Sequence, residues 1–309
     1  MSLGMRAISW YLRRTRKPLW ADAKRFHAHA HGPKAAPQPP RALHQRHAVH
    51  ERSILGFRHY SVNPRHGANQ GVVLYLHGGG YVNEMAVQHW QLVSRMADAG
   101  LRVEVPLYGL APQHHFAQAY AMLNVLYAEL LEHPDTQVLL AGDSAGGGLA
   151  LGFAQSLAAQ GLPSPRGLTL LSPWLDISCT NPAIDALEPL DPWLAKPGAI
   201  LAGQLWARGT DLLDPRLSPL HGPLHALPPM DVYIGTHDIL YPDVLLLQQR
   251  VRSLDSDAAE RLHVTVCPGA CHVYPLLPVS EGKHAARQLV KRMTESLQTR
   301  TSQSATTGA

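Results

Sequence analysis

Short apolar runs alternate with longer amphipathic segments along residues 70–298. Four of these runs, at 72–76, 138–141, 230–234 and 262–266, are rich in valine, leucine and isoleucine. Runs this short, with many branched side chains, are typical of strands. Strands that alternate with helical segments predict an α/β fold, with a mostly parallel central sheet and helices on both faces.

The segments between these runs carry the apolar spacing of helices. They cover residues 84–99, 113–132, 145–160, 243–254 and 281–298. Residues 31–42 are rich in proline, which predicts an extended connection. From Thr299 onward the chain is rich in serine and threonine, so residues 299–309 are predicted to be a disordered tail.

Composition narrows the class of protein. The chain has 309 residues, 45% of them hydrophobic, which is enough for one large globular domain. No apolar run reaches the roughly 18 residues of a transmembrane helix, and the first residues lack the apolar core of a signal peptide. The net charge is only +4, and no nucleic-acid-reading motif appears. The chain has three cysteines, an odd number, which fits a reducing compartment. We therefore expect a cytoplasmic protein that binds no nucleic acid.

The sequence Gly142-Asp143-Ser144-Ala145-Gly146 is the clearest chemical signal. It follows the strand 138–141 and precedes the helix 145–160, which is the context that a G-x-S-x-G turn requires. The flanking glycines allow a sharp turn, where side chains would collide with the neighbouring strand and helix. The helix then directs free N–H groups at negative charge beside the serine. Ser144 is therefore the candidate nucleophile.

A second glycine motif, His77-Gly78-Gly79-Gly80, follows the strand 72–76. A glycine run at a strand end presents backbone N–H groups with no side chain in the way, as an oxyanion hole needs. A plain flexible turn and a phosphate-binding loop are the alternatives. No phosphate-binding glycine pattern follows, and the downstream serine turn favours the oxyanion hole.

Together these motifs resemble the hormone-sensitive-lipase branch of the α/β-hydrolases, and within it bacterial acetyl-hydrolases and short-chain esterases. The resemblance covers roughly residues 50–295 and includes the segments 108–112, 171–176, 214–220 and 227–229. It implies an α/β-hydrolase fold with a small helical cap, and a serine hydrolase that cleaves carboxylic esters. The chain departs from the family at Gly109, Gln113 and Gly148, where arginine, glutamate and asparagine are usual.

The other triad members must follow the serine in the order acid, then histidine. Asp238 follows the strand 230–234, and His272 ends a predicted loop, 267–272, after the next strand. Both therefore lie at the edge where α/β sheets place their sites. The rival acid Asp243 opens a helical run and fits an N-cap. Among the competing histidines, His237 adjoins Asp238, His263 lies in a strand and His284 in a predicted helix.

Ala145, the residue after the nucleophile, is expected to donate its N–H to the oxyanion. The resemblance adds the N–H groups of Gly79 and Gly80. Tyr81 and Trp174 are the candidate substrate-binding residues. Asp143 is interpreted as structural, since a helix N-terminus favours an acid in any case. Asp176 and Asp214, in motifs resembling the family's, are interpreted as fixing loops.

The resemblance implies a cap with two parts, residues 1–45 and the insertion 179–213, over a catalytic domain at 46–298. Their tryptophans, Trp10, Trp20, Trp193 and Trp206, are expected to roof the serine and to limit the length of the acyl chain. The basic, aromatic N-terminal segment also fits a membrane surface. The family's N-terminal cap favours the lid, so membrane association is not expected.

No cofactor or metal is expected. Cys267 and Cys271 bracket the segment before His272. They are close enough in sequence for oxidation to join them in a disulfide. Zinc binding by these two thiols and His272 is disfavoured, because the triad already uses that histidine. The expected partner is a small ester, and a homodimer is left open.

Three functional hypotheses remain. The first is a carboxylesterase for short acyl esters, including acetyl esters. The second is an amidase or formamidase with the same triad, which only assays of matched esters and anilides would separate from the first. The third is a non-catalytic receptor on this fold, which would typically have lost a triad member.

Overall fold

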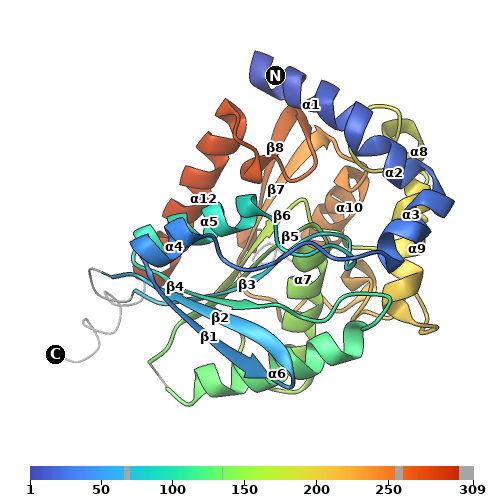
Figure 1. Cartoon of the computed structure of the whole chain (residues 1–309). Coiled ribbons are helices and arrows are strands. Elements are labelled where there is room, and N and C mark those ends of the chain that lie inside the picture. Colours follow the sequence, from blue (N-terminus) through green and yellow to red (C-terminus); the bar gives the residue numbers. More distant parts are fainter. Residues whose placement is uncertain (66–69, 134, 255–259, 299–309) are drawn as a thin grey trace.

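The computed structural model describes residues 1–65, 70–133, 135–254 and 260–298. In this part of the chain, eight strands form one sheet in the order β1-β2-β4-β3-β5-β6-β7-β8 (Figure 1). They are β1 (Ala48–Ile54), β2 (Phe57–Asn63), β3 (Val72–Leu76), β4 (Arg102–Pro106), β5 (Val138–Asp143), β6 (Gly167–Leu171), β7 (Met230–His237) and β8 (Leu262–Cys271). The pairs β1–β2 and β2–β4 are antiparallel, and the other pairs are parallel.

Helices cover both faces of the sheet (Figure 1). One face carries α5 (Val87–Asp98) and α12 (Ser280–Gln298), and the other carries α6 (Phe116–Leu131), α7 (Ser144–Ala159) and α10 (Tyr241–Arg252). The remaining helices are α1 (Leu3–Thr15), α2 (Lys17–Ala21), α3 (Ala23–His31), α4 (Arg41–Arg46), α8 (Ala183–Leu187) and α9 (Lys196–Ala207), with short 3₁₀ turns at Pro219–His221 and Tyr274–Leu276. The predicted α/β fold is confirmed, and the five expected helices are present with ends shifted by a few residues.

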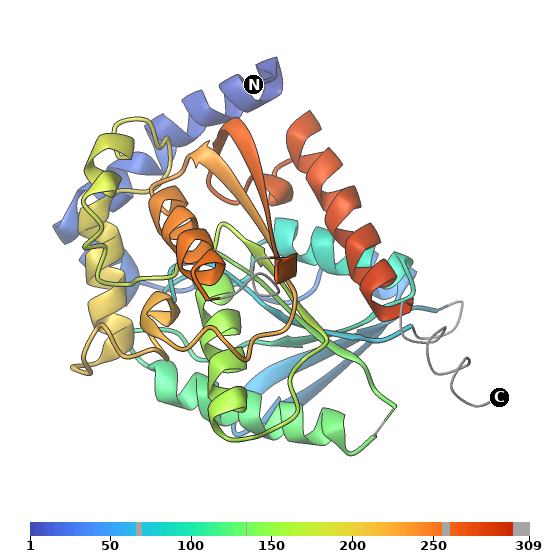
Figure 2. The ribbon, with the colours of Figure 1, turned by 180° about the vertical axis from the view of Figure 1, so that it is seen from behind.

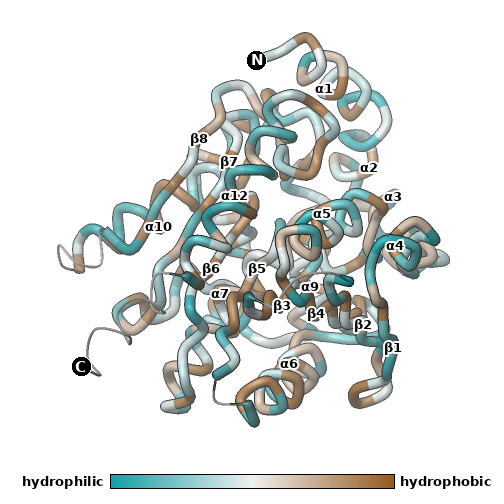
Figure 3. The backbone as a smooth tube through the Cα atoms, turned by 90° about the vertical axis from the view of Figure 1, so that its left-hand side faces the viewer, coloured by the Kyte–Doolittle hydropathy of each residue, from teal (hydrophilic) through white to brown (hydrophobic). Residues whose placement is uncertain are grey.

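The alternation of side chains along β3 explains the two cores. Val72, Leu74 and Leu76 pack into the apolar cluster that also holds residues of α6, α7 and α10. Val73 and Tyr75 point the other way, into the cluster formed with α5 and α12. Both sets are buried, so this central strand is apolar throughout, whereas β1 at the sheet edge is largely exposed and hydrophilic (Figure 3).

The N-terminal helices and the insertion after β6 lie side by side (Figure 2). Helices α2 and α3 contact α9, so closely that a Cβ on Gly198 would lie 2.7 Å from the carbonyl oxygen of Trp20. The Lys17 ammonium donates hydrogen bonds to the backbone carbonyls of Glu188 and Leu194. The two segments expected to form the cap therefore hold one another.

One expectation about this region is wrong. Trp10 does not roof the serine, because its side chain is 58% exposed and the Arg14 guanidinium lies 4.0 Å above its ring. Helix α1 buries Met5 and Leu12 instead, and helical periodicity places Trp10 on the opposite side of the helix. No described helix combines the length and apolar character needed to span a bilayer.

Candidate active site

The turn between β5 and α7 places Ser144 at the carboxyl edge of the sheet. Ser144 has φ +51°, a left-handed conformation that non-glycine residues rarely adopt. The neighbouring glycines are required by packing, because a Cβ on Gly146 would lie 2.0 Å from the carbonyl oxygen of Leu76. A Cβ on Gly142 would lie 2.3 Å from the carbonyl oxygen of Gly146. The turn is therefore compressed between a strand and a helix, as the motif predicts.

The structure brings the three predicted triad residues together. His272 Nε2 lies 2.9 Å from Ser144 Oγ, and His272 Nδ1 lies 2.9 Å from Asp238 Oδ2. The second oxygen of Asp238 accepts the backbone N–H of Leu240 at 3.0 Å. Asp238 and His272 are buried, and Ser144 is 8% exposed. One imidazole therefore bridges the hydroxyl and the carboxylate, as a nucleophile, base and orienting acid do.

Opposing effects act on the pKa of His272. Burial lowers it, because a charged imidazolium loses its hydration. The Asp238 carboxylate raises the pKa by its charge and its hydrogen bond, and the charges of Asp191 and Asp143 raise it as well. Together these effects outweigh the effect of burial. The pKa of His272 is therefore above its ordinary value of 6.5.

The segment before His272 is not the loop that the sequence predicted. Strand β8 runs to Cys271 and pairs with β7 as far as Cys267, opposite Gly235, and again at Cys271, opposite His237. A register shift between Gly235 and His237 accommodates the extra residues. Pro268 and Gly269 fall in this irregular stretch, where Gly269 has φ +72°, so the residues that predicted a loop form a bulge within the strand instead.

The glycine turn after β3 offers unpaired backbone donors. The N–H of Gly78 donates to Asp143 Oδ1 at 2.9 Å, whereas those of Gly79 and Gly80 have no acceptor among the described residues. Gly80 has φ +62°, in the left-handed region. Ala145 lies in the first turn of α7, where backbone N–H groups lack helical partners. These are the donors that an oxyanion hole needs.

Asp143 is a fixed acceptor beneath this turn. Its carboxylate accepts the Tyr75 hydroxyl at 2.6 Å as well as the Gly78 N–H, and His89 Nε2 lies 3.3 Å away. Burial raises the pKa of Asp143, but His89 and the hydrogen bonds outweigh burial and leave the pKa below its ordinary value. Asp143 thus ties the glycine turn to the serine turn. No motif marked Tyr75 or His89, because they lie on β3 and α5, far from Asp143 in sequence.

The two candidate substrate-binding residues are buried side chains. The Tyr81 ring stacks on Trp206, with centroids 4.4 Å apart and planes 3° apart, and on Trp174 at 5.7 Å. The Tyr81 hydroxyl donates to the carbonyl of Ala145 at 2.8 Å. Through Tyr81, this stack therefore supports both the glycine turn and the serine turn. Contact of Tyr81 or Trp174 with substrate stays a prediction.

Two other tryptophans lie against the candidate site. The Trp20 ring covers the glycine turn so closely that a Cβ on Gly80 would lie 2.7 Å from it. The Trp193 ring meets the His272 ring edge-on, with centroids 5.8 Å apart. One comes from the N-terminal segment and the other from the insertion, so both segments expected to form the cap contact the candidate site.

The rival acid, Asp243, is part of a different contact. It lies in the first turn of α10, after Leu240, which occupies the N-cap position that the sequence assigned to Asp243. Its Oδ1 accepts the side-chain N–H of Asn181 at 2.8 Å, and its buried Oδ2 has no partner among the described residues. Burial raises the pKa of Asp243 to about 6.

We expect Asp243→Asn to stabilise the protein above pH 6. The folded state raises the pKa of Asp243 from 3.8 to about 6, so the ionised acid costs stability as the pH rises through this interval. Asparagine removes that cost, about 1–3 kcal/mol, above pH 6 and gains nothing near pH 4. Thermal unfolding across pH checks this, with the exposed Asp135→Asn as control. An equal change in Tm at both pH values would contradict it.

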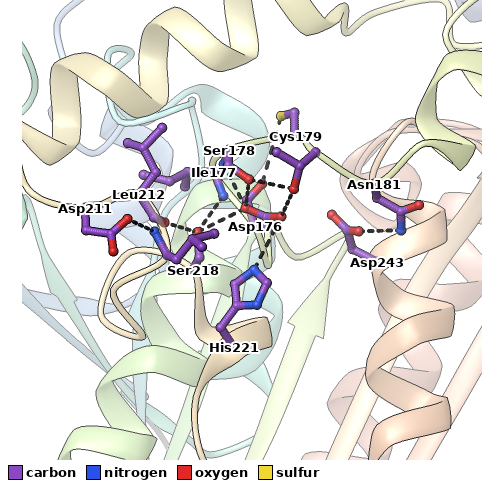
Figure 4. A network of polar contacts seen from close by, with 12 residues as sticks. Asp176, Ile177, Ser178, Cys179, Asn181, Asp211, Leu212, Ser218, His221 and Asp243 are labelled. Atoms are coloured by element: carbon purple, nitrogen blue, oxygen red, sulfur yellow. Dashed lines mark hydrogen bonds and ion pairs between the residues drawn. The ribbon is translucent and has the colours of Figure 1, made fainter.

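A second polar network surrounds Asp176 (Figure 4). Its carboxylate accepts hydrogen bonds from the Ser178 N–H at 2.8 Å and the Thr180 hydroxyl at 3.2 Å. The Ser218 hydroxyl lies 3.3 Å from it, and His221 Nε2 lies 3.5 Å from it. Ser178, Thr180 and Ser218 lie in loops and His221 ends the 3₁₀ turn Pro219–His221, which agrees with the interpretation that Asp176 fixes loops.

The same network borders a cavity of about 410 Å³ between α10 and residues 176–183. None of the three triad residues lines this cavity. Asp214, the other acid interpreted as structural, pairs with Arg216 two residues along, with 2.6 Å between Arg216 Nη2 and Asp214 Oδ2. These acids therefore lie outside the candidate site.

The three cysteines are free thiols. Cys179 and Cys271 are buried, and burial raises the pKa of each to about 12. Cys267 is only half-buried, with a pKa raised by the same cause. Within the described residues, no group of three or more metal-binding side chains is arranged to hold an ion.

We expect the thiols to be dispensable. Cys267 should be alkylated first by iodoacetamide, because reactivity follows exposure and thiolate content. Activity should persist after labelling, in a chelator and without reductant, and Cys271→Ser should stay active. Mass spectrometry of the labelled enzyme, with Cys267→Ser as the unlabelled control, provides the measurement. Inactivation by a chelator that zinc reverses would contradict the absence of a metal.

Known proteins share this architecture. A family model described as the α/β-hydrolase fold matches residues 73–276. A triacylglycerol lipase from Mycobacterium tuberculosis is 34% identical over 190 residues, which cover 60% of this chain and 39% of that protein. An acetyl-hydrolase from Streptomyces hygroscopicus is 34% identical over 180 residues, which cover 57% of this chain and 60% of that protein. The chain thus spans about two fifths to three fifths of the length of these relatives.

A solved structure agrees over almost the whole chain. The crystal structure of an esterase from the bacterial hormone-sensitive lipase family has a TM-score of 0.77 and 27% identity, covering 96% of this chain and 99% of that one. The names of these relatives agree with the carboxylesterase-type hydrolase that the motifs predicted. On its motifs, its sheet and these matches, the chain belongs to the α/β-hydrolase family, in the hormone-sensitive-lipase branch.

Proposed function

We propose that this protein is a serine carboxylesterase that cleaves short-chain acyl esters, including acetyl esters. The observation that carries the proposal is the hydrogen-bonded chain from Ser144 Oγ through His272 to Asp238, with 2.9 Å at each step. A complete chain of this kind argues against a non-catalytic receptor.

The first half of the reaction forms an acyl-enzyme. Ser144 Oγ attacks the ester carbonyl while His272 Nε2 takes its proton. Asp238 holds the Nδ1–H tautomer and stabilises the imidazolium. The N–H groups of Gly79, Gly80 and Ala145 stabilise the oxyanion, and one such donor is worth about 2.7–4 kcal/mol. His272 then protonates the leaving alcohol.

The second half releases the acid. His272 removes a proton from water, which attacks the acyl carbonyl, and Ser144 leaves with a proton from His272. The same donors stabilise the second oxyanion. No cofactor or metal takes part in either half, since side chains and backbone supply every proton and every donor.

The limit on acyl length rests on the cap. Trp20 covers the glycine turn and Trp193 contacts His272, and Ser144 is only 8% exposed. A closely roofed serine leaves little room for a long chain. The proposal therefore names acetyl to hexanoyl esters as the best substrates.

Hydrolysis of p-nitrophenyl esters, from acetate to decanoate, tests this proposal, with p-nitroanilides of the same acids as matched substrates. We expect the rate to peak between acetate and hexanoate and to fall steeply by decanoate. A serine-directed sulfonyl fluoride should label Ser144 and stop hydrolysis. Faster cleavage of the anilides would favour the amidase, and a preference for emulsified long-chain triglycerides would overturn the short-chain limit.

A further inference from the structure

A buried carboxylate outside the triad, Asp191, lies between the cap and the catalytic acid. It belongs to the insertion, between α8 and α9, and is fully buried. Its Oδ1 accepts the backbone N–H groups of Trp193 at 2.7 Å and Leu194 at 2.9 Å. Its Oδ2 accepts the N–H of Ile239 at 3.0 Å. Three backbone donors therefore hold this one side chain.

The contact with Ile239 connects Asp191 to the triad. Ile239 directly follows Asp238, and the next N–H, that of Leu240, donates to Asp238 itself. Two successive backbone donors are thus divided between two carboxylates. Asp191 fixes the first donor and so restrains the backbone turn from which the Asp238 side chain extends.

The other end of Asp191 fixes a wall of the site. Its bonds to residues 193 and 194 close a tight turn, and Trp193 in that turn packs edge-on against the His272 ring at 5.8 Å. The Lys17 ammonium holds the same turn through the carbonyl of Leu194. One carboxylate therefore sets the position of both the acid turn and the ring beside the base.

Asp191 also acts on the site by its charge. The titratable groups that interact with it are Asp238, His272, Cys271 and Lys17, and Asp143 acts on His272 as well. Burial, and then the charge of Asp238, raises the pKa of Asp191 to about 6. In its ionised form Asp191 stabilises the imidazolium and so contributes to the raised pKa of His272.

We propose that Asp191 is a positioning residue of the triad, which fixes the Asp238 turn and the Trp193 wall and supplies a second negative charge to His272. It touches neither the serine nor the reacting atoms. The inference rests on the proposed function only for its kinetic part, because the imidazole titrates whether or not an ester is cleaved.

The test is Asp191→Asn, which keeps the size and removes the charge. The plateau of kcat/KM should fall about tenfold to a hundredfold, because misplacing a catalytic group by about 1 Å costs on that order. The acid limb of the pH profile should move to lower pH, because a neutral imidazole is the base and one source of its raised pKa is gone. Asp243→Asn, a buried acid that does not act on His272, should keep the wild-type plateau and acid limb.

Nuclear magnetic resonance of the His272 ring nitrogens provides the readout that does not depend on turnover. The ring should titrate at lower pH in Asp191→Asn than in the wild type. A wild-type enzyme without esterase activity would contradict the proposed function and leave this measurement intact. A folded Asp191→Asn protein with wild-type titration of His272 and a plateau within twofold of wild type would overturn the role of Asp191.

If Asp191→Asn does not fold, the titration of His272 in the wild-type protein tests the charge contribution of Asp191. Two interacting groups titrate in coupled steps, so the His272 signal should show a second inflection where Asp191 gains its proton. Selective ¹³C labelling of aspartate carboxyls identifies the pH at which Asp191 changes. A single-step titration of His272, unaffected by that change, would overturn the proposed charge contribution.

Discussion

Replacing Ser144 by alanine should reduce kcat/KM for p-nitrophenyl acetate by about 10⁴-fold or more, because the acyl-enzyme can no longer form. His272→Ala removes the base and Asp238→Asn the correct tautomer, and each should cost a similar order of magnitude. All three residues directly follow the ends of strands β5, β7 and β8, so the fold should persist. Steady-state kinetics and thermal unfolding check the two parts.

The losses should not add. The three residues act as one unit, so Ser144→Ala combined with His272→Ala should be no slower than Ser144→Ala alone. Asp243→Asn is the matched control for the acid, because Asp243 is also buried and lies five residues further along the chain but bonds Asn181 instead. Near-full activity in Asp238→Asn, together with its loss in Asp243→Asn, would show that the acid is assigned to the wrong residue.

The features that the sequence predicts are those with short-range causes. Gly142 and Gly146 flank the serine because backbone atoms of the helix and of a strand lie only 2.0–2.3 Å from where a Cβ would be. Any residue other than glycine would collide with them. That requirement is local, so five consecutive residues reveal it. The candidate acid and histidine are found for a related reason, since both follow predicted strands and parallel strands end at a common edge.

The features that the sequence does not reveal depend on distant segments. Asp191 reaches Ile239 across 48 residues and His89 reaches Asp143 across 54, and neither pair has a spacing that any motif records. Trp10 is misplaced by the same limitation. The segment does form a helix, α1, but the face that a helix buries depends on what packs against it.

The structure explains why glycine, and not the arginine usual in the family, stands at position 109. A Cβ there would lie 2.4 Å from the His114 ring and 2.5 Å from the Phe57 ring, and these rings pack edge to face at 5.0 Å. An aromatic pair thus occupies the space that an arginine side chain would need. The sequence showed the loss of a charge but not the rings that take its place.

Gly80→Ala should lower kcat/KM about 10²- to 10³-fold, the typical cost of one lost oxyanion donor. Gly80 has φ +62°, and its new Cβ would lie 2.7 Å from the rigid Trp20 ring. Either the glycine turn or the ring must then move. Movement of the turn displaces the N–H groups of Gly79 and Gly80, the proposed oxyanion donors.

Gly161→Ala separates this effect from backbone strain. Gly161 has φ +65°, almost the same as Gly80, but no atom lies within 4 Å of its would-be Cβ. Both variants should lose about 1 kcal/mol or more of stability from the left-handed conformation, while only Gly80→Ala loses activity. Thermal unfolding and kcat/KM on p-nitrophenyl acetate measure the two effects. Equal activity in the two variants would show that the Trp20 ring moves instead and leaves the donors in place, which would contradict the expected displacement of the turn.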